Sequence, residues 1–337
     1  MAVSTRIIRR RIKSVGNTKK ITRAMELVAA SKMRRAVQNT LKSRPYALAA
    51  WDVLGRLSAA LGDDRHPMLQ VRPVKRLLLI VVTSHRGLCG GFNANVLRRV
   101  FAQLAAPERL AMQRLGVDTT VFPEKDVQVD VVTVGRKGEE AMRRAGKNIV
   151  ASFTLSGDVP TLTEAQPIAT LAMREFTAGT YDKVAIAYTD FISAVVQAPK
   201  FRQLLPLSVT DMEKMIAGTD IGPLMAADAD KPKFLSTLDE AVARDTNEEE
   251  DDGGYVFEPD AAQLLEAMFP RLLETQVYQA LLESSASEHS SRMMAMRSAS
   301  DAATDMIDDL TLTFNQARQA SITREIAEIA AGVAAQN

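Results

Sequence analysis

The sequence predicts an α/β protein in which the N- and C-terminal helices form a long antiparallel two-helix coiled coil and the middle of the chain forms a Rossmann-like α/β domain. Apolar residues recur at helical spacing near the start, a 3.5-residue repeat runs through the last part, and strand-like and helix-like segments alternate between them. We therefore divide the chain into an N-terminal coiled-coil helix (1–60), a central α/β domain (75–207), an acidic linker (208–258) and a C-terminal coiled-coil helix (259–337).

The N-terminal helix is predicted from an apolar stripe that contains no proline between residues 7 and 41. The positions expected to face a partner helix are Ile8, Ile12, Val15, Ile21, Met25, Val28, Met33 and Val37. Pro45 is expected to end or bend this helix, because proline removes a backbone donor and clashes with the preceding turn.

The C-terminal helix is predicted from alternating steps of four and three residues, the repeat of a left-handed coiled coil. Its seam comprises Leu282, Ala286, His289, Met293, Met296, Ser300, Ala303, Ile307, Leu310, Phe314 and Ala317. The seam then shifts by one residue and continues through Ile322, Ile326, Ile329 and Val333. Because no proline follows Pro270, a helix of roughly 60 residues and about 90 Å is expected after it.

The two predicted helices are expected to pair with each other. Many seam positions are alanine or serine, which allow close approach, and the N-terminal helix is the other long helix predicted in the chain. The alternative is a homodimer formed through the C-terminal helix.

The central segment reads as a mainly parallel sheet with helices on its faces. The expected strands are 76–84, 127–135, 148–155, 183–191 and 194–205, and the expected helices are 92–105, 136–146 and 162–178. The acidic run "NEEEDDGG" (247–254) interrupts this rhythm and predicts a flexible loop.

Charge is strongly polarised along a chain whose formal net charge is only +1. Residues 1–44 hold 13 basic residues and one acid, Glu26, whereas residues 208–258 hold 14 acids and 4 bases. The basic helix could bind nucleic acid, an anionic membrane or an acidic protein surface. The lack of aromatic residues in 1–44 and the narrow stripe of "ELVAASKM" favour a protein partner.

No catalytic, metal or cofactor site is expected from the residues. Cys89 is the only cysteine, and His66, His85 and His289 lie in different segments. The loop "SHRGLCGGFN" (84–93) lies where phosphate-binding turns occur, but its glycines follow neither phosphate-binding spacing, so it is predicted to be a structural turn.

Four motifs resemble the gamma subunit family of the rotary F-type ATP synthase: "NTKKITRAMELVAASKMRRA", "TSHRGLCGGFNANV", a segment that begins "FEPDAAQLLEAMFPRLLETQVYQ", and "FNQARQASITREIAEIAAGVAA". The resemblance implies a central rotor shaft without catalysis or nucleotide binding of its own. It turns inside three alpha and three beta subunits and stands beside the epsilon subunit on the membrane c-ring. It also implies no cofactor, no nucleic-acid partner and hydrogen ion transport coupled to ATP synthesis.

The resemblance also implies which residues contact partners. Met25 matches a position that faces the acidic lower segment of the beta subunit, and Arg292, Arg318, Gln319 and Thr323 match positions that line the coupling contacts near the hexamer. The tail 326–333 would reach the apolar bearing at the top of the hexamer. His85 departs from the usual Asp of the family, and the acidic segment is longer than usual.

The expected location is peripheral to the membrane, on the cytoplasmic face of the bacterial inner membrane. Two other classes of function stay open from the residues alone: a Rossmann-like nucleotide-dependent enzyme and a DNA-binding coiled coil.

Overall fold

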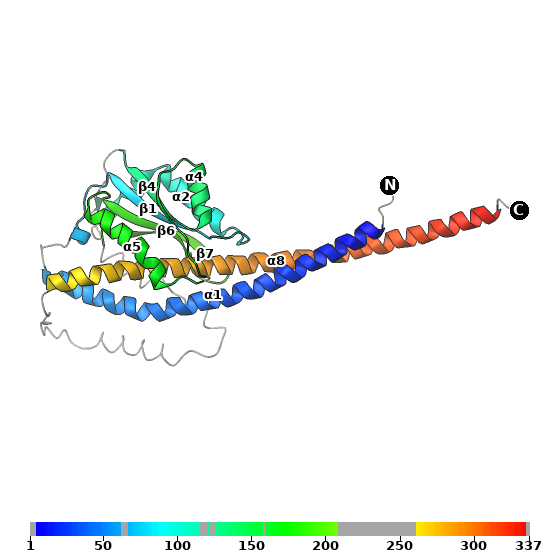
Figure 1. Cartoon of the computed structure of the whole chain (residues 1–337), viewed down its shortest axis with the longest axis horizontal. Helices are drawn as coiled ribbons and strands as arrows, with labels where there is room; N and C mark the ends of the chain where they lie inside the picture. Colours follow the sequence, from blue (N-terminus) through cyan, green and yellow to red (C-terminus); the bar gives the residue numbers. More distant parts are fainter. Residues whose placement is uncertain are drawn as a thin grey trace.

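The structure, a computed structural model, describes residues 5–61, 67–114, 120–121, 126–157, 159–207 and 261–334. The predicted acidic linker 208–258 lies outside the described residues. Two helices dominate the molecule: α1 (Thr5–Leu61) and α8 (Ala261–Ala334). They run side by side in opposite directions, so that both chain ends lie at the same end of the shaft, and α8 projects beyond α1 (Figure 1). The predicted antiparallel two-helix coiled coil is confirmed.

Both helices contain a proline. α1 continues through Pro45 to Leu61, so Pro45 does not end this helix, and Pro270 lies inside α8, which continues after it to Ala334 as expected. Tertiary packing explains the difference. Ala50, beyond Pro45, and Phe269, beside Pro270, are both buried in the same core cluster. Burial on both sides of a proline offsets its cost of about 3 kcal/mol in a helix.

Contacts between α1 and α8 give their register. Arg9 lies 5.2 Å from the centre of the Phe314 ring, Thr22 bonds to Ser300, and Ala36 packs with Ala286. One step forward on α1 therefore corresponds to one step back on α8. Because the seam of each helix is filled by the other, the pairing within one chain is supported over the homodimer alternative.

The seam predicted for α8 is confirmed from Leu282 to Ala317. Its predicted continuation through Ile322, Ile326 and Ile329 is exposed, because these residues lie beyond the first described residue of α1.

The seam predicted for α1 is wrong in its middle. Ile21 and Val28 are 61% and 52% exposed, while Thr22 and Ala29 are buried. The observed seam repeats every seven residues from Ile8. It therefore passes through Thr22 and Ala29, whereas large apolar residues had been expected in this part of the seam. Small side chains at these positions let the two helices approach closely.

A five-stranded sheet forms the centre of the α/β domain, in the order β5-β4-β1-β6-β7. The first four strands of this order are parallel and β7 is antiparallel to β6, which confirms the mainly parallel sheet. The strands are β1 (Arg76–Val82), β4 (Gln128–Val134), β5 (Ile149–Phe153), β6 (Lys183–Phe191) and β7 (Gln197–Leu205). β7 starts later than expected because Ser193 N–H donates to Val196 O in the turn before it.

Two apolar clusters cover the two faces of this sheet. Alternate residues of β1 supply them: Leu78 and Ile80 face one cluster, and Leu77 and Leu79 face the other. The first face is covered by α5 (Leu162–Thr177) and α8, and the second by α2 (Phe92–Leu104), α3 (Pro107–Ala111) and α4 (Arg136–Arg144).

Three small elements were not predicted from the sequence: the 3-10 turn η1 (Pro67–Leu69), α3, and the hairpin of β2 (Gln113–Arg114) and β3 (Thr120–Val121). Each is too short for a periodic pattern to develop.

The first third of α8 belongs to the core of the α/β domain as well as to the shaft. Leu265, Phe269, Leu273, Val277 and Leu281 are fully buried in the cluster on the α5 face. The same continuous helix therefore packs on the sheet of the α/β domain and forms one of the two helices of the coiled coil. The domain and the shaft are thus joined through one continuous helix rather than through a flexible linker.

Candidate functional site: the shaft surface and its junction with the domain

The far end of α8 is a single helix with an exposed surface. By the register above, Thr5 of α1 lies level with Ala317, and every residue from Arg318 to Ala331 is exposed. This projecting segment, Arg318–Ala334, extends about 25 Å beyond the first described residue of α1. Arg318, Gln319 and Thr323, predicted as partner contacts, all lie on it.

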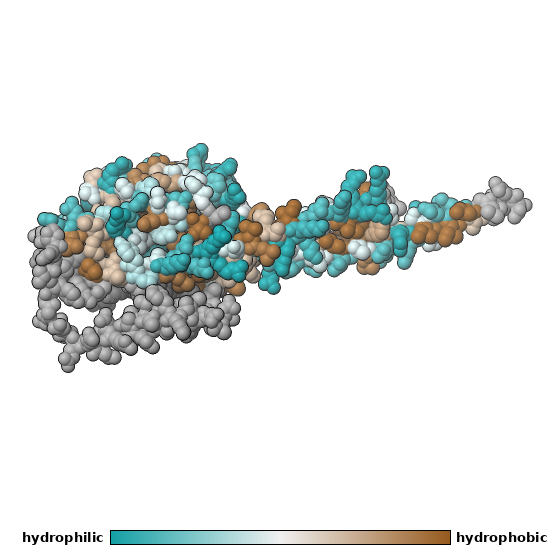
Figure 2. All heavy atoms as spheres, turned by 60° about the horizontal axis from the view of Figure 1, so that its bottom comes forward, coloured by the Kyte–Doolittle hydropathy of each residue, from teal (hydrophilic) through white to brown (hydrophobic). Residues whose placement is uncertain are grey.

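The projecting segment is apolar as well as exposed. Ile322, Ile326 and Ile329 continue the predicted seam in its shifted phase and are 48%, 62% and 69% exposed. Figure 2 shows brown, apolar surface along this end of the shaft. Isolated exposed isoleucines are ordinary, but three at helical spacing on a bare helix indicate a surface that contacts another chain.

A second apolar stripe lies on the outer side of α1. Ile21, Met25 and Val28 recur at helical spacing, with Met25 half-buried and the other two exposed. Met25 and Val28 also line a hollow of about 690 Å³ between α1, α8 and the loop that holds His85 and Leu88. Met25 is therefore half-buried at the wall of this hollow, between α1, α8 and the loop.

Basic side chains surround this stripe. Arg23, Arg34 and Arg35 are exposed on α1, and Arg23 pairs with Glu26 at 2.7 Å. Residues 1–44 contain no other acid, so most of this positive charge has no acidic neighbour on its own helix. The surface is suited to carboxylates on another chain, with its strength dependent on salt.

Arg292 lies in a different setting from the other predicted contacts. Its side chain is 11% exposed and forms an ion pair of 2.7 Å with Glu288. It also donates to Gly87 O at 3.3 Å and contacts His289 Nδ1 at 3.1 Å. His289 is buried, as expected for its seam position. Arg292 thus joins the shaft to the loop after β1, and it does not lie near the projecting segment.

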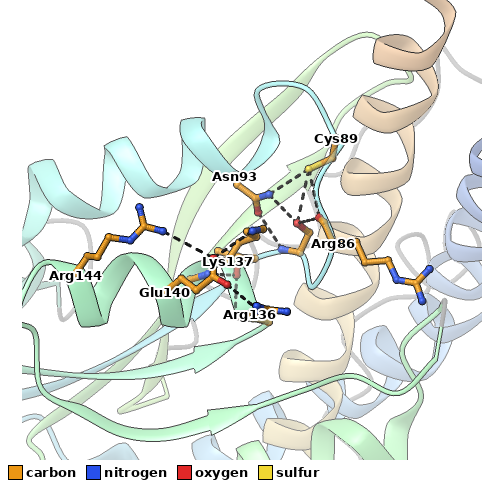
Figure 3. A network of polar contacts seen from close by, with 11 residues as sticks. Arg86, Cys89, Asn93, Arg136, Lys137, Glu140 and Arg144 are labelled. Atoms are coloured by element: carbon orange, nitrogen blue, oxygen red, sulfur yellow. Dashed lines mark hydrogen bonds and ion pairs between the residues drawn. The ribbon is translucent and has the colours of Figure 1, made fainter. Parts of the chain in front are cut away.

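The loop 84–93 closes on itself through hydrogen bonds. Asn93 Nδ2 donates to Ser84 Oγ at 2.7 Å and to Cys89 Sγ at 3.2 Å, while its Oδ1 accepts from Ser84 N–H at 3.0 Å (Figure 3). Gly90, with φ of +55°, approaches α8 closely: a Cβ there would lie 3.6 Å from Ala295 Cβ. The bonding of Ser84 and Asn93 within the loop supports the predicted structural turn over a phosphate site.

The start of α4 carries a cluster of surface charges. Glu140 pairs with Arg136 at 2.7 Å and with Lys137 at 3.2 Å, as Figure 3 shows. Hydrogen bonds from Lys137 and Arg136 lower the pKa of the Glu140 carboxyl. The cluster is a solvated helix surface.

Within the described parts of the chain, no three His, Cys, Asp or Glu side chains gather in a way that could hold a metal ion. The helices that the structure describes include none with the length and apolar character to cross a membrane.

These features define a stalk protein: a long, asymmetric coiled coil with a compact α/β domain fixed near one end and a bare helix tip at the other. Its distinctive surfaces are an exposed apolar helix tip and a basic stripe on α1.

Comparisons with known proteins identify the family. A family model described as ATP synthase matches residues 4–336. The ATP synthase gamma chain of Roseiflexus castenholzii is 43% identical over 336 residues, covering 98% of each protein. That of Stenotrophomonas maltophilia is 40% identical over 333 residues, covering 98% of this chain and 99% of the relative. A solved central stalk of the Tetrahymena thermophila mitochondrial ATP synthase is 25% identical with a TM-score of 0.55, covering 83% of this chain and 99% of that one.

The chain belongs to the family of ATP synthase gamma chains. It is the central rotor shaft of an F-type ATP synthase and a subunit of that membrane-associated complex.

Proposed function

We propose that the chain turns inside a ring of three alpha and three beta subunits, with the projecting segment of α8 inside the ring. The α/β domain then stands at the opposite end, beside the epsilon subunit and on the c-ring. The family membership supports this arrangement, and so does the solved Tetrahymena assembly of central stalk and c-ring. Ion flow through the membrane sector would turn the domain, and α8 would carry the rotation to the catalytic sites on beta.

The observation that carries the proposal is the projecting segment itself: an exposed helix with three exposed isoleucines, rigidly continuous with the core of the domain. A shaft of one or two helices has no threefold symmetry. At any angle it therefore presents a different surface to each of three equivalent sites. Differential contact of this kind shifts the conformational equilibrium of each site separately.

We assign partner contacts to Met25, Arg318, Gln319 and Thr323. Met25 stands in the exposed stripe of α1 among arginines, which suits an amphipathic, acidic segment of beta. The other three are exposed on the projecting segment, where a polar or charged side chain can reach the surrounding ring.

For Arg292 we propose that it contributes indirectly to the contact with a partner subunit, by positioning the loop after β1. Its bond to Gly87 O holds the loop after β1 against α8, and its ion pair with Glu288 on the same helix fixes the arginine side chain. The loop would then be kept in the position in which its exposed residues His85, Arg86 and Leu88 meet the partner.

We further propose that the chain performs no catalysis and works on the cytoplasmic face of a bacterial inner membrane. The bacterial gamma chains to which it is similar support this location.

Purification of the tagged full chain from its native membrane tests the proposal. We expect one copy with three alpha and three beta subunits, and ATP-driven rotation of a bead attached to the α/β domain. A stable homodimer free of these subunits would contradict it. Salt-sensitive DNA binding that persists in the cell, or tight nucleotide binding by the isolated chain, would instead favour one of the other two classes of function.

A further inference from the structure

A buried polar cluster lies where α8 crosses the β6–β7 hairpin. It consists of Glu283 on α8, Tyr188 and Asp190 on β6, and Lys200 and Arg202 on β7. Glu283 is 7% exposed, Asp190 2% and Tyr188 0%. The surfaces assigned above to partner contact include none of these residues.

The geometry of the hairpin brings these side chains to one face. Tyr188 and Asp190 are two residues apart on β6 and therefore point to the same side of the sheet. Tyr188 pairs with Lys200 and Ile186 pairs with Arg202 across the hairpin, which puts both cations on that side. Tyr188 and α8 share one apolar cluster, so this is the face that α8 covers.

Only part of the cluster is paired. Lys200 Nζ forms an ion pair with Asp190 Oδ2, and the Arg202 guanidinium lies 5.0 Å from the centre of the Tyr188 ring. Three buried atoms, Glu283 Oε2, Tyr188 OH and Arg202 Nη1, form no hydrogen bond of good geometry with the described residues, although the Tyr188 hydroxyl lies close enough to Glu283 to favour its charged form. Glu283 Oε2 is an acceptor, whereas Tyr188 OH and Arg202 Nη1 are donors. The two donors can therefore bond to the ionised Glu283 carboxylate.

The same surroundings make ionisation of Glu283 difficult. Burial raises the pKa of the Glu283 carboxyl to about 7; the positive charge of Arg202 opposes this shift, and the negative charge of Asp190 adds to it. Burial also raises the pKa of Tyr188, so its hydroxyl stays a donor.

The other elements packed on α8 contribute little charge at this level. By the register, α1 places Gln38, Asn39 and Thr40 opposite residues 282–284, and none of these three can ionise. On α5, Glu164 accepts bonds from Ser156 and Thr161, and Arg174 pairs with Glu175 near the surface. The charged groups that face Glu283 are therefore those of β6 and β7.

We propose that Glu283 is a proton-binding site that controls how firmly α8 is held on the β6–β7 hairpin. With the proton bound, the neutral carboxyl donates a hydrogen bond to Asp190, which remains paired with Lys200. When the proton leaves to solvent, the two carboxylates repel each other, and Glu283 turns toward Arg202 and the Tyr188 hydroxyl. The junction between the rotor shaft and its α/β domain is then firmer in the protonated state.

The direction of the pH dependence follows from the sign of the shift. An unfolded glutamate titrates near pH 4.3, so the folded state holds a proton that the unfolded state has released between about pH 4.3 and pH 7. The contribution of the Glu283 proton to the free energy of unfolding is fully present below about pH 4.3, and it is lost as the pH rises through about 7.

Carbon NMR of the full chain, labelled at glutamate side-chain carboxyls, tests the site, with Glu283→Gln to assign its signal. We expect a titration midpoint within about one unit of pH 7, and a lower midpoint in Asp190→Asn, which removes the repelling charge. Glu266→Gln, at an exposed position on the same helix, is the matched control and should leave the midpoint unchanged. A Glu283 midpoint below about pH 5 overturns the proposal.

Hydrogen exchange of the β6 and β7 amides tests the consequence. After correction for intrinsic exchange rates, we expect protection to fall several-fold between about pH 6 and pH 8 in the unmodified chain and to stay constant in Glu283→Gln. Equal protection at both values in the unmodified chain would overturn the link to the junction. If Glu283→Gln fails to fold, the comparison of the unmodified chain with Asp190→Asn carries the same test, because the fall should move to lower pH.

Discussion

Thr22 of α1 and Ser300 of α8 share a hydrogen bond of 2.7 Å between two buried hydroxyl groups that are 278 residues apart in the sequence. Thr22 Oγ1 also donates to Lys19 O at 3.0 Å, so its single proton is used and Ser300 is the donor between the two helices. The bond favours one register of the shaft, because any shift would leave the buried Ser300 hydroxyl without its acceptor.

Replacement of Thr22 by valine should therefore destabilise the shaft. The shape is kept, but Ser300 is left buried without its acceptor, and we expect a loss of about 1–3 kcal/mol in the free energy of unfolding. Urea unfolding of the full chain measures this loss. A double-mutant cycle with Ser300→Ala should recover about 1 kcal/mol, whereas strict additivity of the two single changes would show that the bond contributes nothing.

Gly135 is expected to tolerate no side chain. Its φ is +91°, and a Cβ there would lie 2.2 Å from Thr83 O, at the point where the turn after β4 passes the end of β1. Gly135→Ala should cost about 3 kcal/mol or more, from backbone strain and a displaced β1.

Gly146 supplies the matched control for that change. Its φ is +64°, but nothing lies within 4 Å of the position a Cβ would take. Gly146→Ala should thus cost only about 1–2 kcal/mol. Equal melting temperatures for the two variants would contradict the steric argument at Gly135.

Arg292 is expected to hold the loop after β1 in a protected conformation. In Arg292→Met the contact with Gly87 O and the ion pair with Glu288 are both lost, and we expect faster amide exchange over residues 84–91 and a lower coupling of ATP hydrolysis to pumping. Arg297→Met, at an exposed position on the same helix, should change neither measurement. Normal protection of the loop in Arg292→Met would argue against this role.

Substitutions on the projecting segment should affect assembly and coupling without affecting the fold. Gln319→Leu and Thr323→Val remove exposed polar groups, so neither should alter the unfolding of the α/β domain. Both should weaken assembly and coupling several-fold if these side chains contact the surrounding ring. ATP-driven proton pumping by reconstituted vesicles checks this, and full pumping by both variants would remove the two residues from the contact.

The long-range pairing of α1 with α8, the mainly parallel sheet and the family could all be predicted from local patterns. The seam of α8 shows why: Leu282 to Ala317 keep one repeat over ten steps, and all of them are buried or half-buried in the structure. A repeat of that length leaves little room for another interpretation.

Other features depended on contacts that no local pattern contains. The α1 seam runs through Thr22 and Ala29 because close approach of α8 selects small residues there, while the larger Ile21 and Val28 are left outside. Pro45 stays inside a helix, and Ala50 beyond it is buried in a core cluster formed with the distant α8 and α/β domain. Arg292 matches a family contact position by sequence, yet its partners are Gly87 and Glu288.

By itself the sequence determined the two helices, the order of strands and helices between them, and membership of the gamma chain family, because periodicity and family motifs are properties of short segments. Only the tertiary structure decided which side of α1 faces outward, that α8 is shared between shaft and domain, and that Glu283 meets Asp190 and Arg202. Those relationships join residues about eighty or more positions apart, and whether a side chain there is buried or exposed depends on what the distant segment places against it.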